Sequence, residues 1–358
     1  SGVGKTLAAH SLEQLHAQHV WLLQGLVDIG ATCMAIDRVA QETRAAASGG
    51  VSQLAVYSSN VCLIDSTAQL RLLLDTAKAA GHTQVLPIAA LTRDLKGEQL
   101  ADMHTLAHTG AVAFSNAQQP IHSNLVLKRC MEYAATFDLL VTFRPQDADL
   151  SHKGCAHDGA IAARLGLPGI PASAETLALA RALLLAEETG IRIHIHQLSA
   201  KASLPLLRSA RRRGVRVTAD VSIHHLLADE NAIAGFDSNF HLLPPLRGVA
   251  DRAALLEAVA DGTIDAISSQ HTPLSAPAKQ QPFGASLPGI AGVETLLPLT
   301  LQLVEDGKLP LLRALDAVTH AAARCLGQTS GQIQPGQAAN LCLLDPASRQ
   351  RPADHWQS

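Results

Sequence analysis

Two histidine pairs have the residue types and spacing for metal binding or acid–base chemistry. His194 and His196 form an H-x-H pair on a predicted strand, where alternate residues share one face. Imidazole nitrogens are zinc ligands and exchange protons near neutral pH. His224 and His225 are adjacent, so on a strand they point to opposite sides and make a poor chelate. We interpret the first pair as packing or hydrogen bonding inside the fold, with a relocated metal site as the alternative.

Three further motifs favour ordinary structural roles. His152, His157 and Asp158 lie in a predicted loop, SHKGCAHDG, which we interpret as a solvated polar loop rather than a metal site. The segment SGVGKT at residues 1–6 resembles a phosphate-binding loop, but no strand precedes it and the first glycine of the motif is missing. The chain also lacks the G-x-S-x-G sequence of a nucleophile elbow.

The composition indicates a large core and argues against two classes of partner. Of the 358 residues, 47% are hydrophobic and 16% charged, the net charge is −3 and the pI is about 6.6, so the basic excess of nucleic-acid and membrane-surface binders is absent. The six cysteines form no C-x-x-C pair, which fits reduced thiols. No apolar run is long enough to span a membrane, and the first residues lack the apolar stretch of a signal peptide. We expect a cytoplasmic protein without nucleic-acid or membrane partners.

Strand-like and helix-like segments alternate along most of the chain. Amphipathic stretches with apolar residues at i, i+3 and i+4 separate short β-type runs. The predicted strands are 21–28, 51–58, 83–90, 111–114, 139–143, 191–198, 215–221 and 263–268. Eight strand–helix units predict an α/β fold of the (β/α)8 TIM-barrel type, with a doubly wound open sheet as the alternative.

The two ends of the chain predict a small separate unit. After the eighth strand, residues 288–307 and 309–327 have helical patterns, and GQIQPGQAANLCLLDP reads as turn, strand and turn. That last strand has no helix beside it, so it should pair with strands elsewhere. We therefore assign 21–330 to the barrel and assign 1–20 and 331–358 to the remnants of a small β-sandwich.

Several longer phrases resemble the dihydroorotase family of the amidohydrolases. They include GLVDIGAT, GAVAFSN, LGLPGIPASAET, TGIRIHIHQLS, VTADVSIHHL, LPPLRGVADRAAL and PFGASLPGIAGVETLLPL, in the family's order across residues 24–344. The resemblance implies a barrel with a β-sandwich built from both termini. The N-terminal share of that sandwich is short here and looks truncated.

The resemblance also implies that the metal site has been lost. In the family, two metal ions activate water and polarise a cyclic amide at the C-terminal ends of the strands. The positions that match the family's ligands carry no imidazole or carboxylate; they are Gly30, Thr32, Asn116, Arg144, Gln197 and Gln270. Arg144 would place a fixed positive charge where a metal ion should sit. We therefore expect no metal cofactor, although active relatives use zinc.

The positions that match substrate contacts are also changed. Met34 replaces an arginine that follows the H-x-H pair of the family, and Leu243 replaces an asparagine before the paired prolines. His271 retains a family histidine, but Gln270 replaces the neighbouring aspartate, so we expect His271 to lack its partner. Because Gln197 matches a ligand that faces the lumen, a regular strand would turn His194 and His196 towards the helices or leave them at the rim.

The pattern is similar to one branch of the family, an inactive dihydroorotase homologue that associates with aspartate carbamoyltransferase in pyrimidine biosynthesis. The resemblance implies that this chain is not an enzyme. It would be a non-catalytic subunit holding the carbamoyltransferase catalytic chains in a hetero-oligomer such as a dodecamer. Two alternatives stay open. One is a metal-dependent cyclic amidohydrolase with a displaced site, and the other is a ligand-binding protein that uses the vacated barrel mouth.

Overall fold

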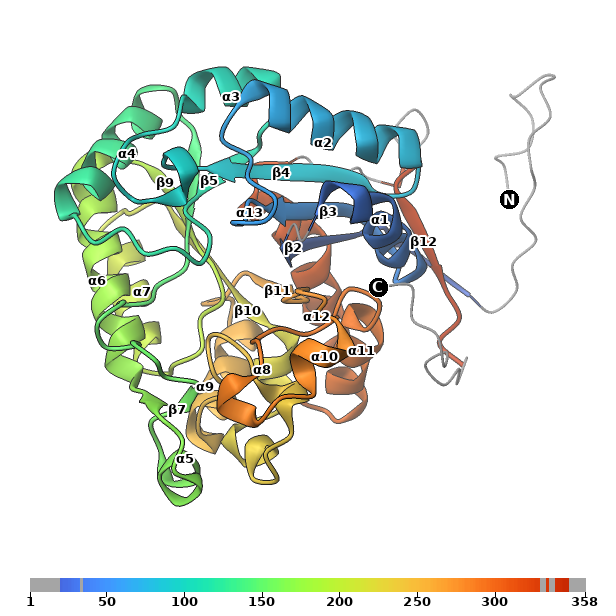
Figure 1. The fold of residues 1–358 in the computed structure, drawn as a ribbon. Coiled ribbons are helices and arrows are strands. Elements are labelled where there is room, and N and C mark those ends of the chain that lie inside the picture. The colour runs from blue at the N-terminus through green and yellow to red at the C-terminus, as the bar shows by residue number, and fades with distance from the viewer. Residues whose placement is uncertain (1–19, 33–34, 329–332, 335–338, 348–358) are drawn as a thin grey trace.

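Eight parallel strands form the centre of the molecule. The computed structural model describes residues 20–32, 35–328, 333–334 and 339–347. The strands follow one another around the sheet as β2 (Leu26–Thr32), β3 (Val51–Tyr57), β4 (Gln84–Ala90), β5 (Ala113–Ser115), β6 (Leu140–Phe143), β9 (Arg192–Ile195), β10 (Val217–Ser222) and β11 (Ala266–Ser268). The first and last strands lie side by side, so the sheet closes nearly into a barrel, as Figure 1 shows. The predicted (β/α)8 barrel is confirmed.

Contacts after the last strand tie it to the first. Asp28, on β2, accepts hydrogen bonds from the backbone N and the hydroxyl of Ser269, which follows β11. The backbone N of Thr32 donates to the carbonyl of His271 at 2.9 Å. Burial raises the pKa of Asp28, although the hydrogen bonds from Ser269 oppose the shift.

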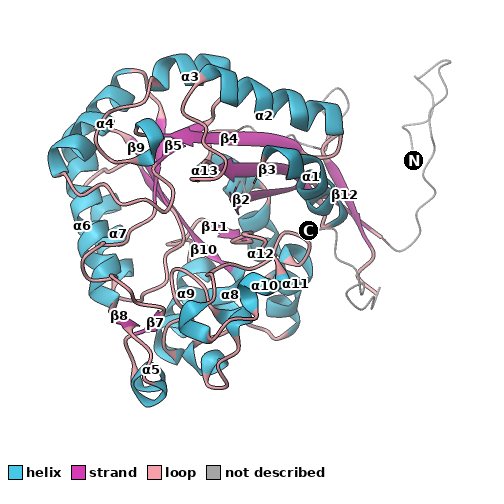
Figure 2. Ribbon diagram, in the orientation of Figure 1, coloured by secondary structure: helices cyan, strands magenta, loops and turns pink. Residues whose placement is uncertain are grey.

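Helices surround the strands, as Figure 2 shows. They are α1 (Val39–Ser48), α2 (Thr67–Ala80), α3 (Met103–Thr109), α4 (Asn124–Thr136), α5 (Ala160–Leu165), α6 (Ala172–Thr189), α7 (Ser203–Arg212), α8 (Ile223–Leu227), α9 (Val249–Ala260), α10 (Ala276–Lys279), α11 (Leu296–Glu305), α12 (Leu311–Val318) and α13 (His320–Cys325). Local sequence sets their ends. Ser66, for example, caps α2 by accepting from the backbone N of Gln69, and Gly81 ends that helix with φ +68°.

The buried side chains of the barrel form two layers. Leu54 and Val56 of β3 point outward and pack with helix residues such as Leu70 and Leu73. The alternate residues of the strands form an inner cluster, which also includes Cys325 of α13. Strands buried on both faces explain why the predicted strands are almost continuously apolar.

The predicted strand at 21–28 is in fact two strands. β1 (Trp21–Gln24) pairs antiparallel with β12 (Leu341–Leu344) in a separate small sheet, whereas β2 belongs to the barrel. Gly25 separates them, and a Cβ there would lie 2.3 Å from the Ser52 hydroxyl. Residues 21–24 thus lie outside the barrel that we had assigned to 21–330. Residues 1–19, including the SGVGKT segment, and most of 329–358 lie outside the described residues.

Two other sequence expectations are corrected. The predicted helix at 288–307 begins only at Leu296, because Gly289 has φ +158° and Ile290 forms a β-bridge with His271. Four cysteines are free and buried, but Cys62 takes part in a disulfide bond, so the expectation of thiols throughout is wrong. Within the described residues, no helix has both the length and the apolar character to cross a membrane.

Candidate functional site

Two adjoining pockets lie where the strands end at the barrel mouth. The mouth pocket has a volume of about 260 Å³ and is lined in part by Thr32, Arg144, His196 and Gln197. The side pocket has a volume of about 210 Å³ and shares Arg144 with the mouth pocket. TIM-barrel enzymes carry their active sites at this end of the barrel. The structure therefore gathers Thr32, Arg144 and Gln197, three positions that the resemblance assigns to metal ligands, at one pocket.

Asn116, the position matched to the bridging carboxylate, lines the side pocket and is held by hydrogen bonds. Its amide nitrogen donates to the carbonyls of Leu95, at 3.0 Å, and Gln119, at 3.1 Å. Its amide oxygen accepts from the Thr92 hydroxyl at 2.6 Å. Because a carboxylate has no proton to donate to two carbonyls, this environment favours an amide over the acid that would bridge two metals.

Arg144 and Gln270 converge on one backbone oxygen. Gln270 donates from Nε2 to the carbonyl of Leu243 at 2.8 Å, and Arg144 donates from Nη1 to the same oxygen at 3.3 Å. The other terminal nitrogen of Arg144 donates to Gln146 Oε1 at 2.7 Å. Two positions of the family's metal shell are thus joined to Leu243, a position matched to a substrate contact. Burial lowers the pKa of Arg144 to about 10, where the guanidinium is still charged at neutral pH.

Gly30 lies at an irregularity in β2 that leaves no room for a side chain. The register of β2 against β3 shifts between Asp28 and Ala31. A Cβ on Gly30 would lie 2.9 Å from the Ser268 Cβ and 3.0 Å from the Gln270 backbone N. Thr32 shares a hydrogen bond with the Thr272 hydroxyl at 3.1 Å. Met34, the other substrate position, lies outside the described residues.

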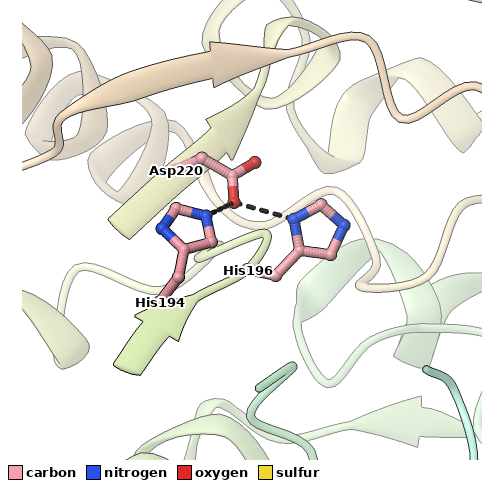
Figure 3. Close-up of side chains that lie close together, drawn as sticks. All are labelled: His194, His196 and Asp220. Carbon is pink, nitrogen blue, oxygen red and sulfur yellow. Dashed lines mark hydrogen bonds and ion pairs between the residues drawn. The ribbon is translucent and has the colours of Figure 1, made fainter. Parts of the chain in front are cut away.

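His194, His196 and Asp220 form a buried cluster, which Figure 3 shows, and His196 also lines the mouth pocket. His194 Nε2 lies 3.0 Å and His196 Nδ1 lies 2.8 Å from the same Asp220 oxygen, Oδ1. The other nitrogen of His194 bonds to the Thr218 hydroxyl at 2.8 Å, and the His196 ring stacks on Tyr57. Among the described residues, these three are the one group of His, Cys, Asp or Glu side chains arranged to share a metal ion. Two imidazoles and a carboxylate are a known zinc ligand set.

The prediction that both histidines point to the helices or the rim is wrong for His194, whereas His196 lies at the rim, where it lines the mouth pocket. Both are buried, and their rings reach Asp220 on the next strand and Tyr57 in the inner cluster. The error came from extending regular alternation through residue 197. Strand β9 ends at Ile195, and Gln197 has φ +60°. One left-handed residue breaks the period of two, so Gln197 and His196 both line the mouth pocket.

Attraction between opposite charges outweighs burial in setting the pKa values of His194 and Asp220. Burial alone would lower the pKa of His194, but Cys325 and the hydrogen-bonded Asp220 outweigh it and raise the pKa to about 10. Burial would likewise raise the pKa of Asp220, yet His196 and His194 bring it well below its usual range. The cluster is a buried ion pair in which one carboxylate oxygen accepts from both rings and from the Gln197 backbone N.

His271 and His225 have structural partners. The Nδ1 atom of His271 accepts from the backbone N of Gly292, and its Nε2 lies 2.8 Å from the carboxylate of Glu42 on α1. The expectation that His271 lacks a partner is therefore wrong. His225 bonds the carbonyls of Pro244 and Pro245, and burial lowers its pKa to about 3.

In the predicted loop, His157 contacts Arg247 at 3.2 Å. It forms no metal-ligand group with His152 and Asp158 among the described residues.

Sequence reasoning missed Asp220, Tyr57 and Glu42. Asp220 had a detectable signal, because an acid in the apolar strand VRVTADV is buried and needs a partner. Tyr57 and Glu42 meet their histidines only through the closed barrel, so no local pattern could reveal them.

The eight-stranded sheet with its surrounding helices places the chain among the (β/α)8-barrel proteins. The family model described as dihydro-orotase-like matches residues 19–203. A dihydroorotase-like protein of Pseudomonas aeruginosa is 47% identical over 320 residues, which cover 89% of this chain and 76% of the relative. This chain belongs to the dihydro-orotase-like family.

Other relatives and solved structures agree with this fold. A dihydroorotase-like protein of Pseudomonas putida is 43% identical over 364 residues, covering 100% of this chain and 86% of the relative. A protein of Syntrophotalea carbinolica named dihydroorotase is 35% identical and covers 96% of this chain and 82% of its own length. The D-hydantoinase of a Thermus species superposes with a TM-score of 0.78 at 21% identity, over 96% of this chain and 80% of the other, which is a likeness of fold.

Proposed function

We propose that this chain is a non-catalytic, dihydroorotase-like subunit that scaffolds an aspartate carbamoyltransferase complex in the cytoplasm. The main support for a loss of catalysis is the direction in which hydrogen-bond donors point at the barrel mouth. Asn116, Arg144 and Gln270 occupy positions matched to metal ligands, and each donates hydrogen bonds to backbone carbonyls. The N–H groups turned to protein oxygens cannot bind a cation, and the amide oxygens of Asn116 and Gln270 are neutral and outside the usual zinc ligand set of thiolate, imidazole and carboxylate.

The packing supports the same proposal. Gly30 lies too close to Ser268 and to the Gln270 backbone for a histidine to enter without a shift. The positions matched to the family's metal site therefore lack ligand side chains, and the packing around Gly30 closes part of that site. Because Arg144 adds a positive charge there, a second cation would meet direct repulsion. None of the six positions fits the family's metal pair, so we assign no chemical step to one.

The partner follows from the resemblance to inactive homologues, and the surface offers a place to test it. Leu177 and Leu184 lie seven residues apart on the same face of α6 and are 57% and 62% exposed. Leu125 of the neighbouring α4 is 62% exposed. Large apolar side chains gathered on an outer helix face are typical of protein–protein contacts.

The test is assembly with purified aspartate carbamoyltransferase catalytic chains from the same organism. Light scattering after gel filtration should show one hetero-oligomer, and carbamoyltransferase activity should depend on this chain. The double variant Leu177→Lys, Leu184→Lys should weaken assembly. Leu312→Lys is the matched control, because Leu312 is 82% exposed on α12. Separate elution of the two wild-type proteins at micromolar concentration would contradict the proposal.

A second candidate function is a hydrolase with one displaced metal ion. The specific observation in its favour is the His194, His196 and Asp220 cluster, whose ligand atoms all lie within 4.8 Å of one another. The second carboxylate oxygen of Asp220 is buried without a hydrogen-bond partner. This candidate predicts one tightly bound zinc that His196→Asn removes, together with hydrolysis of dihydroorotate. Zinc without hydrolysis would reject it as an enzyme.

A further inference from the structure

The barrel mouth contains two cationic side chains; Arg181 has an acidic neighbour, Asp147, whereas Arg144 has none among the described residues that line the pockets. Arg144 lines both pockets, and Arg181 of α6 lines the side pocket with it. The described residues that line the two pockets include no Asp or Glu. Among the described residues, Arg144 forms no ion pair, whereas exposed arginines such as Arg208 and Arg213 do. A sheltered charge without a counter-ion is unfavourable, and an anion from solution would compensate it.

The guanidinium of Arg144 has N–H donors that its two hydrogen bonds do not use. Arginine has five N–H donors, and the Leu243 carbonyl and Gln146 Oε1 accept only two of them. Those two bonds hold the planar group in place, so little side-chain freedom remains to be lost when a ligand binds. A fixed planar fork suits the paired oxygens of a carboxylate or phosphate.

The rest of the mouth pocket supplies neutral donors and apolar walls. Gln197, Ser58 and Asn60 line it together with Leu274 and Leu287. His196 also lines it, and Figure 3 shows that the second ring nitrogen of His196 points away from Asp220. A volume of about 260 Å³ suits a small metabolite better than a polymer.

We propose that the barrel mouth is a binding site for a small organic anion, held through its carboxylate or phosphate group by Arg144, with Arg181 as a second cationic wall. This is a binding function beyond the scaffolding role. A guanidinium replaces the metal ion as the cation of the barrel mouth, and it binds the anion without activating water. The scaffolding role is measured by assembly, so either proposal can fail without the other.

The experiment measures thermal stabilisation and calorimetric binding with two probes, inorganic phosphate and succinate, against sodium chloride at equal ionic strength. We expect at least one probe to raise Tm saturably beyond the effect of sodium chloride. Stabilisation by phosphate alone assigns a phosphorylated ligand, and stabilisation by succinate alone assigns a carboxylate. Arg144→Gln should weaken binding at least tenfold, which corresponds to the loss of a charged hydrogen-bond donor.

The controls distinguish binding in the pocket from a general effect of the protein's charge. Arg129→Gln removes an exposed charge from α4 that is paired with Glu132, and it should leave the affinity unchanged. If Arg144→Gln does not fold, Arg181→Gln tests the second cation of the side pocket, which Arg144 also lines, and should weaken binding in the same direction. No saturable stabilisation by either probe would overturn the proposal. Unchanged affinity in the folded Arg144→Gln or Arg181→Gln protein would also overturn it.

Discussion

Gln270 donates a hydrogen bond to the backbone carbonyl of Leu243 at 2.8 Å. The resemblance matches Gln270 to a metal-binding aspartate and Leu243 to a substrate-binding asparagine. In this chain the two positions bind each other, and Arg144 joins the same oxygen. The mouth of the barrel is therefore bonded internally at the positions that the resemblance matches to metal and substrate contacts.

Restoring one ligand should not restore the site. Gly30→His should give no zinc binding and no dihydroorotase activity, because the other positions still lack ligands. It should also lower the free energy of unfolding by about 1–3 kcal/mol, since its Cβ would overlap Ser268. Urea denaturation and an activity assay measure both effects.

Gly235→His is the matched control for this variant. Gly235 has open space around it and no positive φ, so the substitution should leave stability nearly unchanged. Detectable hydrolysis by Gly30→His alone would contradict the loss of the metal shell.

Asn116→Asp should be destabilising at neutral pH. The new carboxylate would face the carbonyls of Leu95 and Gln119, which now accept from the amide. We expect a loss of about 2 kcal/mol in the free energy of unfolding. This environment raises the pKa of the new acid, so the penalty should shrink as the pH falls and the acid is protonated.

The control for this variant is Asn239→Asp at an exposed position. It should be nearly neutral across the same pH range. Unaltered stability and zinc uptake by Asn116→Asp would show that the position still tolerates a bridging carboxylate.

The buried His194 and Asp220 pair should make stability depend on pH. Because the pKa of His194 is raised from 6.5 to about 10, its contribution is complete below pH 6.5 and is lost as the pH rises through 10. Asp220 has a lowered pKa, so its contribution is present above its ordinary pKa and is lost in acid. The pair should therefore stabilise the fold most between about pH 4 and 6.5.

Asp220→Asn tests this linkage directly. It should lower the free energy of unfolding by about 3–5 kcal/mol at pH 6, because His194 is left without its buried carboxylate. It should also flatten the decline of stability between pH 7 and 10, measured by urea denaturation. An unchanged slope in the variant would assign the decline to other groups.

The barrel could be predicted from the sequence, whereas the arrangement at its mouth could not. Eight apolar runs and the helices between them determine the fold, because each unit is locally periodic. A single residue at the mouth, Gln197, departs from the strand geometry, and its φ of +60° brings its side chain into the pocket beside His196. Polar residues at strand ends deviate from regular geometry, and periodicity carries no information about them.

Contacts between residues far apart in the sequence set the second limit on what the sequence can predict. Glu42 is 229 residues from His271 in the sequence, and only barrel closure brings the two side chains together. Asp220 was within reach of sequence reasoning, since a carboxylate inside an apolar strand needs a buried partner. The changed residues at Asn116 and Arg144 were recognised by the resemblance, but their hydrogen bonds required the structure.

The most direct test of lost catalysis is metal content measured by plasma mass spectrometry together with a dihydroorotase assay on the same purified chain. The predicted result is less than about 0.1 zinc per chain and no turnover, because the six positions that the resemblance matches to metal ligands carry neither imidazole nor carboxylate. Near one or two zincs per chain with measurable turnover would contradict it, and His196→Asn would then show whether the ion lies between His194, His196 and Asp220.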